Sequence, residues 1–411
     1  MINRFIKNYL FEKDFQVPST TKFVLKWFKK LEIKPIHWLD QLTNYQLETL
    51  QEQYYATSQA PIIMNCKSHN AQTLIPTTYL YQFNNALIHT RSSNFLYGLQ
   101  EDLMVERVLE ADIQYCDYAT GYLRYHNQTH ALIKNKFKKK CIQYSQNTLY
   151  LGGNGAYNYY HWLIEIAPKL LLVTPQLLEK YNIEYLILDK SIETTPSLQK
   201  ILDILLNVQQ LKIQIIYKNH DELSLFKNLF YINHRNNFVF NSKEKLSSIH
   251  FSCFCPNLIQ TLRTACLSQT ASSPSRLNFP DRIFLARKAH SVRAYNQDEI
   301  LNYFVQQGFS ELYLEDYSFL EQIQIFNQAK FIIGPSGAAW SNIIFSQAGT
   351  QALSWLPKQI SEFSAFSTLA HFVGCDMKFI LTQSEDVENV HSNYSVDLNQ
   401  VIELYQHMML N

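Results

Sequence analysis

FIIGPSGAAWSNIIF, residues 331–345, joins an apolar strand to an apolar helix through a turn that holds two glycines. Residues 330–335 predict a buried strand, and residues 338–347 predict a helix. Such a turn directs backbone N–H groups and the positive end of the helix dipole toward the space above the strand. The pattern predicts an anion site, which a diphosphate fits best. A purely structural tight turn is the competing interpretation.

Glycine is scarce in this chain, with 10 among 411 residues, about a third of the usual ~7%. Two of the ten lie in the turn above. Three more, Gly152, Gly153 and Gly155, lie in GGNGAYNYYHWLIEIAPKL, residues 152–170. We expect so sparing a chain to keep glycine where a positive φ or a close backbone approach requires it. Both clusters therefore predict constrained backbone, and we expect them to form two walls of one site.

Apolar strands alternate with helical segments from residue 282 to residue 357 and, less regularly, from residue 159 to about residue 240. This alternation predicts parallel βαβ units. We therefore expect an α/β protein with two α/β domains that face one another. The expected parts are a helix-leaning N-terminal extension over residues 1–70, an α/β domain over residues 71–245, a second α/β domain over residues 246–395 and a C-terminal helix over residues 396–411.

Basic residues follow the strand RIFLARK, residues 282–288, which places Arg287 near its C-terminal end. In a parallel α/β sheet ligands bind at that end. Arg293 and Asn296 follow in the loop that enters the next helix. Arginine pairs with phosphate oxygens bidentately, and asparagine can hydrogen-bond a base or a sugar. A solvated basic loop is the competing interpretation. Glu315, after the next strand, is a candidate for holding ribose hydroxyls.

The helix predicted from about Tyr159 carries His161 and Glu165, which are four residues apart and share one face. In that arrangement the carboxylate can orient the imidazole and raise its basicity, so we predict His161 as a general base and Glu165 as its helper. The reverse assignment and a purely structural i,i+4 contact remain open. Tyr157 and Tyr160 are candidates for stacking on sugar rings, although part of this aromatic group is expected in the core.

Composition limits the partners. A net charge of +1 gives no global field for nucleic acid. No window approaches ~18 consecutive apolar residues, so we expect neither a signal peptide nor a membrane span. Residues 21–39, TKFVLKWFKKLEIKPIHWL, mix lysines with aromatic residues, which predicts either a basic amphipathic helix at a membrane surface or an ordinary packed helix. The spacing of the seven cysteines fits neither a metal site nor a redox pair, so we expect free thiols. Free thiols are typical of a reducing compartment such as the cytoplasm.

The motifs for common cofactors are missing from the sequence. It contains no DxD, the usual carboxylate pair for a divalent cation on a nucleotide diphosphate, and its histidines are scattered. We therefore predict no metal and no cofactor. GGNGAYN suggests a nicotinamide site, but Asn158 stands where the fingerprint GxGxxG needs its third glycine.

The order of YYHWLIEIAPKL, then RIFLARK with RAYNQDEI, then FIIGPSGAAWSNIIF resembles glycosyltransferase family 61 from about residue 150 to about residue 358. The resemblance implies an inverting, nucleotide-sugar-dependent transferase of the GT-B type, with two Rossmann-like domains facing a central cleft and the donor in the C-terminal domain. It implies a glycan acceptor. Because no anchor is found, the resemblance is closest to the bacterial enzymes that build capsule and other surface polysaccharides on lipid-linked glycans at the cytoplasmic face.

Seven residues match the family pattern by position, and the resemblance implies that they bind the donor: Arg287, Arg293, Asn296, Gly334, Gly337, Ala338 and Asn342. Two positions depart from it. Ser336 replaces a histidine beside the expected phosphates, so a hydroxyl donates without adding charge. Gln297 replaces an acid, which removes any ionic role there. A non-catalytic carbohydrate-binding or scaffold protein with a degenerate site is therefore the alternative function.

Overall fold

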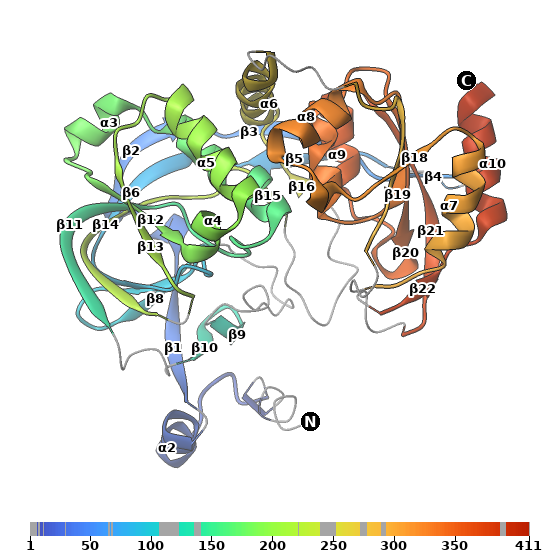
Figure 1. The fold of residues 1–411 in the computed structure, drawn as a ribbon. Helices are drawn as coiled ribbons and strands as arrows, with labels where there is room; N and C mark the ends of the chain where they lie inside the picture. Colours follow the sequence, from blue (N-terminus) through green and yellow to red (C-terminus); the bar gives the residue numbers. More distant parts are fainter. Residues whose placement is uncertain are drawn as a thin grey trace. The chain divides into compact units, whose positions relative to one another are not determined.

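The computed structural model describes residues 12–28, 30–64, 69–106, 123–134, 141–220, 222–238, 252–271, 278–288, 293–386 and 392–410, together with residues 6, 9, 10 and 66 (Figure 1). The chain divides into two units. Unit 1 is built from Met1–Gln53 and Pro76–Arg235, and unit 2 from Tyr54–Ile75, Asn236–Val239 and Leu246–Asn411. Each unit contains a β-sheet and helices, which confirms the predicted α/β class.

Unit 2 is organised around five parallel strands. In spatial order they are β18 (Ser310–Leu312), β17 (Arg282–Leu285), β19 (Phe331–Pro335), β20 (Gln351–Pro357) and β21 (Asp376–Ser384). β21 also pairs with β4 (Ile62–Ile63) in parallel and with β22 (Tyr394–Ser395) antiparallel. Numbered along the chain, the five parallel strands lie in the order 2-1-3-4-5. This is a doubly wound order whose topological switch point lies between β17 and β19.

Helices cover both faces of the unit 2 sheet (Figure 1). On one face lie α7 (Gln297–Gln306) and α10 (Leu398–Leu410), and on the other α6 (Pro256–Ala271), α8 (Phe319–Gln328), the 3-10 helix η8 (Ala338–Phe345) and α9 (Ala365–Phe372). Phe304 of α7 and Tyr405 of α10 share one buried core with Phe284 and Trp355 of the sheet. The C-terminal helix is therefore part of the fold of unit 2.

Residues 54–75 also belong to unit 2, which corrects the expectation that residues 1–70 form a separate extension. They contain the antiparallel pair β3 (Tyr54–Ser58) and β5 (Ala71–Ile75). The buried hydroxyl of Ser58 hydrogen-bonds that of Ser364 at 3.1 Å, just before α9. Polar contacts of this kind fix the segment, and a pattern of hydrophobic residues does not reveal them.

Unit 1 contains a mixed sheet. Four of its strands are parallel, in the order β13 (Gln214–Lys218), β12 (Tyr185–Asp189), β11 (Ile142–Tyr150) and β14 (Ser224–Ile232). The sheet continues through β6 (Thr78–Ile88), β7 (Phe95–Tyr97), β8 (Asp102–Val105), β1 (Leu31–Trp38), β10 (His130–Lys134) and β9 (Leu123–His126), with β2 (Gln46–Gln51) beside β6. Most of these added pairings are antiparallel.

The Rossmann-like pattern expected for this half is thus limited to β13, β12, β11 and β14. Their chain order is 3-2-1-4, with the switch point between β11 and β14. The antiparallel strands bring a cluster of aromatic rings to the core, including Phe83, Phe95 and Tyr231. Local sequence patterns predicted strands in this region but not which strands pair, because pairing depends on contacts between residues far apart in sequence.

The N-terminal segment is less helical than expected. α2 (Ser19–Phe28) ends before β1, so residues 21–39 do not form one helix. Pro35, which lacks a backbone N–H and disfavours a helix interior, lies within β1 and explains the change. In α2 Leu25 is buried while Phe23 is 55% exposed. The side chains of residues 27–29 lie outside the described residues, and membrane contact by α2 stays a prediction.

Two further findings concern the described residues only. None of their helices reaches the length and apolarity needed to span a bilayer. Their cysteines at positions 66, 141, 253, 255, 266 and 375 are free thiols.

Unit 1 should lose stability as the pH falls below about 6.5. Burial lowers the pKa of His89 to about 3 and that of His126 to about 4. In the unfolded chain both histidines have a pKa of ~6.5. Below that pH the unfolded chain therefore binds a proton at each histidine, whereas the folded chain leaves both neutral until the pH approaches the lowered pKa values. Each histidine should therefore cost about 1.4 kcal/mol of unfolding free energy per pH unit between pH 6 and pH 4.

Urea denaturation at pH 7 and at pH 5 measures this loss. His89→Gln and His126→Gln should each flatten the pH dependence by about one proton equivalent. An unfolding free energy that stays constant from pH 7 to pH 5 would contradict the prediction.

Candidate functional site

The first glycine cluster forms a loop at the C-terminal end of β11, beside the switch point of unit 1. Gly152 and Gly155 have φ angles of 88° and 78°, in the left-handed region that favours glycine. A Cβ on Gly153 would lie 1.9 Å from the carbonyl oxygen of Thr90. All three glycines therefore meet a backbone requirement, as the sparing use of glycine predicted.

The helix after this loop begins at Tyr159 and continues as the π-helix η4 (His161–Ile166). π-Helical turns occur often at functional sites. His161 Nδ1 lies 2.7 Å from Glu165 Oε2, and Tyr160 Oη donates to Glu165 Oε1 at 3.3 Å. Glu165 is only 4% exposed. The predicted contact between histidine and glutamate is therefore present, and a buried carboxylate holds the imidazole.

The geometry of this pair specifies how each group can act. A neutral His161 that donates from Nδ1 to Glu165 carries its lone pair on Nε2. Both carboxylate oxygens of Glu165 already accept hydrogen bonds from the protein. The arrangement is that of a base held by an orienting acid, so it favours His161 over Glu165 as the group that takes a proton.

Gly155 provides the space for the imidazole. A Cβ on Gly155 would lie 2.5 Å from His161 Cδ2, which is closer than real Cβ contacts allow. Gly155→Ala should therefore displace the ring and lower any turnover that depends on His161 about 100-fold, since small misplacements of a reacting group have such effects.

A matched control is Gly98→Ala. Gly98 has a φ of 72°, close to that of Gly155, but a Cβ there would meet nothing within 4 Å. Both substitutions should lose about 1–2 kcal/mol of stability to left-handed strain. Equal turnover by the two variants would show that the ring does not depend on Gly155.

A second buried cluster continues from the same helix and was not predicted from the sequence. Lys169 is fully buried, and its Nζ donates to the carbonyl oxygen of Ile232 at 2.9 Å and lies 3.5 Å from His234 Nε2. His234 Nδ1 in turn lies 2.5 Å from Glu106 Oε2. Lys169 lies in the 3-10 helix η5 (Ala167–Leu172), which directly follows η4. In the sequence, the only sign of this cluster is the lysine inside the apolar run IAPKLLLV, which indicates a buried charged residue.

The cluster meets the glycine loop at the end of β14. A Cβ on Gly152 would lie 3.0 Å from His234 Cε1, so the loop packs directly on this histidine. Burying a charged lysine is costly unless it is paired and hydrogen-bonded. Lys169 is paired with the carboxylate of Glu106 through His234, which lies between them. The cluster also fixes the loop that carries Gly155.

The two tyrosines predicted to stack on sugars have different environments. Tyr160 is 7% exposed, bonds Glu165 and packs edge-on against His161, contacts that suit it to positioning that pair. Its stacking on a sugar stays a prediction. Tyr157 is half-buried, and the guanidinium of Arg91 lies 4.4 Å from its ring centroid.

Arg91 also pairs with the buried Asp189 at 3.2 Å. Burial alone would raise the pKa of Asp189, but hydrogen bonds from Ser191 and Thr90 and the charge of Arg91 outweigh burial and hold the pKa below its ordinary value. Asp189 therefore stays ionised and keeps Arg91 over the ring of Tyr157.

In unit 2 the predicted donor residues gather at the switch point between β17 and β19. Arg287 lies just beyond β17, and its guanidinium donates to the carbonyl oxygens of Ser336 at 2.6 Å and Arg293 at 2.9 Å. The bend between β19 and η8 and the loop before α7 are thus tied together by one side chain.

Gln297, which departs from the family pattern, holds the backbone of Arg287. The N–H of Arg287 donates to Gln297 Oε1 at 2.7 Å, and Gln297 Nε2 donates to the carbonyl oxygen of Arg287 at 2.9 Å. An ionised carboxylate only accepts hydrogen bonds and would make the first of these alone. Glutamine at position 297 therefore fixes the backbone of Arg287 with two hydrogen bonds, whereas a carboxylate would make only one.

Two guanidinium groups meet at the backbone of Gly337. A Cβ there would lie 3.4 Å from Arg287 Nη2 and 4.0 Å from Arg293 Nη2. An anion bound at the backbone of Gly337 would therefore meet two guanidinium groups, which form strong charge-assisted hydrogen bonds with phosphate oxygens. One turn earlier, a Cβ on Gly334 would lie 2.7 Å from Leu285 Cβ, so glycine allows β17 and β19 to approach.

The remaining predicted residues lie around this bend. Ser336 is buried, Ala338 opens η8, and Glu315 is exposed in the turn after β18. Asn296 bonds both backbone polar groups of Val396, at 2.9 and 3.0 Å. Asn342 is fully buried and donates to the carbonyl oxygen of Ala339 at 3.2 Å. Asn296 and Asn342 therefore hold backbone in place, and their contact with the donor stays a prediction.

The described residues contain no cluster of three or more His, Cys, Asp or Glu side chains suited to a metal ion.

Comparison with protein families matches residues 159–353 to the family described as Glycosyltransferase 61. No curated protein matches the chain. The matched region starts two residues before His161, contains both arginines and the bend around Gly337, and ends in β20. Residues 159–353 therefore form a glycosyltransferase family 61 domain, which indicates as general activity the transfer of a sugar from a donor to an acceptor.

Proposed function

We propose that the protein is an inverting glycosyltransferase that moves a sugar from a nucleotide-sugar donor to a hydroxyl of a glycan. In this proposal the architecture is GT-B-like, with unit 2 holding the donor and unit 1 supplying the base. The acceptor is a lipid-linked glycan or a growing surface polysaccharide, such as a capsule, and the reaction takes place in the cytoplasm of a bacterium. Nucleic acid is not a partner.

The observation that carries the proposal is the meeting of two guanidinium groups at the Gly337 backbone, at the switch point where doubly wound sheets bind ligands. Arg287 and Arg293 supply charge, and the start of η8 supplies backbone N–H groups and the positive end of a helix dipole. A diphosphate is the anion that such a site would stabilise as it leaves. Arginine charge serves here in place of a metal ion.

His161 is the proposed base. The oxygen of the acceptor hydroxyl attacks the anomeric carbon while its proton passes to His161 Nε2. The bond from that carbon to the diphosphate oxygen breaks, and its electron pair stays on the diphosphate. Attack opposite the leaving group inverts the anomeric centre. Glu165 stabilises the imidazolium that forms, through the contact at 2.7 Å.

A thermal-shift screen against a panel of nucleotide sugars tests the proposal. The donor should raise the melting temperature by mass action, and the ranking of the panel identifies its sugar and nucleotide. The preferred donor should then be hydrolysed slowly when no acceptor is present. A scaffold protein with a degenerate site would leave every nucleotide sugar intact, and that outcome would replace the proposal with the alternative function.

A further inference from the structure

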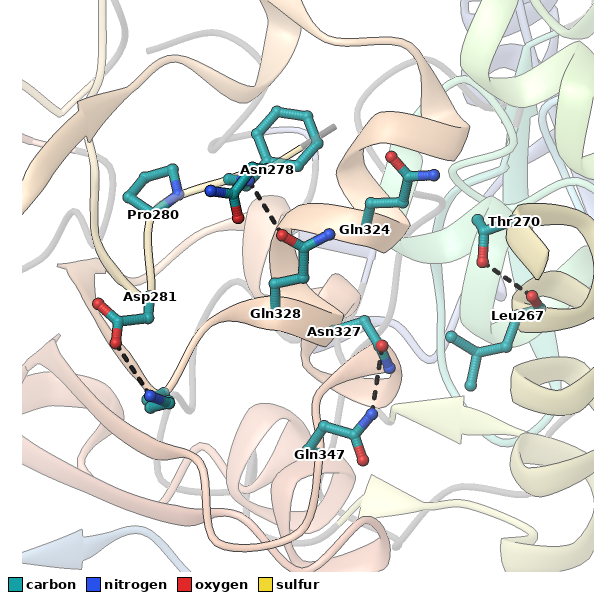
Figure 2. A pocket seen from close by; sticks show the side chains of 11 residues that line it. Leu267, Thr270, Asn278, Pro280, Asp281, Gln324, Asn327, Gln328 and Gln347 are labelled. Atoms are coloured by element: carbon teal, nitrogen blue, oxygen red, sulfur yellow. Dashed lines mark hydrogen bonds and ion pairs between the residues drawn. The ribbon is translucent and has the colours of Figure 1, made fainter. Parts of the chain in front are cut away.

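Unit 2 contains a large polar cavity at the N-terminal edge of its sheet, opposite the edge that carries Arg287. Its volume is about 970 Å³, within the range typical of ligand sites. The cavity lies where α6, α8 and the residues leading into β17 meet (Figure 2). The lining residues are Leu267, Thr270, Asn278, Phe279, Pro280, Asp281, Gln324, Asn327, Gln328, Lys330 and Gln347.

Carboxamides dominate this lining. Five of the eleven lining side chains are asparagine or glutamine, and Figure 2 shows those of α8 between the strand-entry residues on one side and α6 on the other. Asp281 and Lys330 form an ion pair at 3.1 Å, so their charges cancel. A lining without net charge that can both donate and accept hydrogen bonds, and that also includes the apolar side chains of Leu267, Phe279 and Pro280, suits a ligand with hydroxyl groups and apolar faces.

Gln324 gives the second and independent observation. It is 8% exposed, yet its carboxamide makes no hydrogen bond with any residue that the structure describes, and it lines the cavity. Gln322 on the same helix is equally buried, and its Nε2 donates to the carbonyl oxygens of Leu314 and Tyr317 at 2.9 and 3.0 Å. The polar atoms of Gln324 are not sealed in the interior, so they are available to hydrogen-bond a ligand that enters the cavity.

The space is longer than a single sugar ring requires. A neighbouring hollow of about 640 Å³ shares Asp281, Asn327, Gln328, Lys330 and Gln347 with the cavity. It continues along the same edge of the sheet toward Gln351 and Met409. Phe279 adds an aromatic ring to the main cavity, and its ring packs edge-on to Tyr317 at 5.9 Å.

We propose that this amide-lined cavity binds a neutral oligosaccharide, at a site separate from the one that holds the donor. The carboxamide of Gln324 and the Oε1 of Gln347 hydrogen-bond its hydroxyl groups, while Asn327, which accepts from Gln347 Nε2 at 3.2 Å and donates to the carbonyl oxygen of Phe345 at 2.9 Å, positions Gln347. The ring of Phe279 contacts an apolar sugar face. The inference depends on the lining alone and not on the transfer reaction.

An array of neutral oligosaccharides, probed with the full chain, tests the proposal. The best ligand is then titrated calorimetrically against the wild type and two lining variants, Gln324→Leu and Gln347→Ala. Each variant should bind about tenfold more weakly, because each loses a hydrogen bond to the sugar. Gln347 is exposed, so Gln347→Ala keeps the test valid if Gln324→Leu fails to fold.

Two controls separate this site from the rest of the protein. Gln306→Leu makes the same chemical change on the exposed end of α7, on the other face of the sheet, and should leave the affinity unchanged. Arg287→Ala should also leave oligosaccharide binding unchanged, even if donor binding is lost or was never present. Failure of every array sugar to bind at millimolar concentration would overturn the proposal. Undiminished binding by both lining variants would overturn it as well.

Discussion

Replacing Arg287 with alanine should weaken binding of the nucleotide-sugar donor and lower transfer by about 100-fold, the loss typical of one charged group aimed at a leaving oxygen. Two effects combine. The substitution removes one of the two positive charges beside Gly337, and it removes the hydrogen bonds to the carbonyl oxygens of Ser336 and Arg293 that shape the bend. Calorimetric titration of the donor and single-turnover rates measure the two losses.

Lys288→Ala is the matched control, because Lys288 is the next residue and also a cation. Its side chain is exposed and pairs with Asp316 at the surface. Surface ion pairs contribute little, so donor affinity should change less than twofold. Arg287→Lys tests the charge separately from the geometry of the guanidinium group. Lysine keeps the positive charge but cannot make two hydrogen bonds in a fixed fork, so we expect it to recover only part of the lost donor affinity. Equal effects of Arg287→Ala and Lys288→Ala would contradict the phosphate assignment.

Replacing His161 with alanine should lower the rate of transfer by about 10²–10⁴-fold, the usual contribution of a general base, while donor affinity changes little. In the proposed mechanism the imidazole acts on the acceptor proton, whereas the proposed donor contacts of unit 2 stay intact. Measuring kcat and the donor Kd for the same variant separates these effects. A variant that loses donor affinity and keeps its rate once saturated would show that His161 is not the base.

Glu165→Gln decides between the two assignments of the base. If Glu165 orients His161, the glutamine keeps a hydrogen-bond acceptor near Nδ1 and loses the charge, so the rate should fall about tenfold, well short of the loss in His161→Ala. If Glu165 is itself the base, the two variants should be equally impaired. Glu165 is nearly buried and bonded by Tyr160 as well as His161, so the melting temperature of each variant is measured beside its rate.

Much of the candidate site was predictable because it depends on residues close together in sequence. His161 and Glu165 are four residues apart on one helix, and helix geometry alone brings them together. The glycines were recognisable because the chain has so few of them. The role of Gln297 was not predictable, since it lies in the reciprocal bonds with the backbone of Arg287. The burial of Tyr160 was not predictable, because an aromatic residue beside a histidine gives the same sequence pattern whether its ring is buried or exposed.

The amino-acid sequence by itself determined the α/β class, the glycine turn before η8, the pairing of His161 with Glu165 and the family, because each follows from periodicity or from motifs with local spacing. Only the tertiary structure decided the strand order that places Arg287 and Gly337 at one switch point, the membership of residues 54–75 in unit 2 and the partnership of Lys169 with His234. These depend on contacts between residues far apart in the chain. Sheet order and buried polar pairing leave no local pattern, because the free energy that selects them arises only when the distant segments pack.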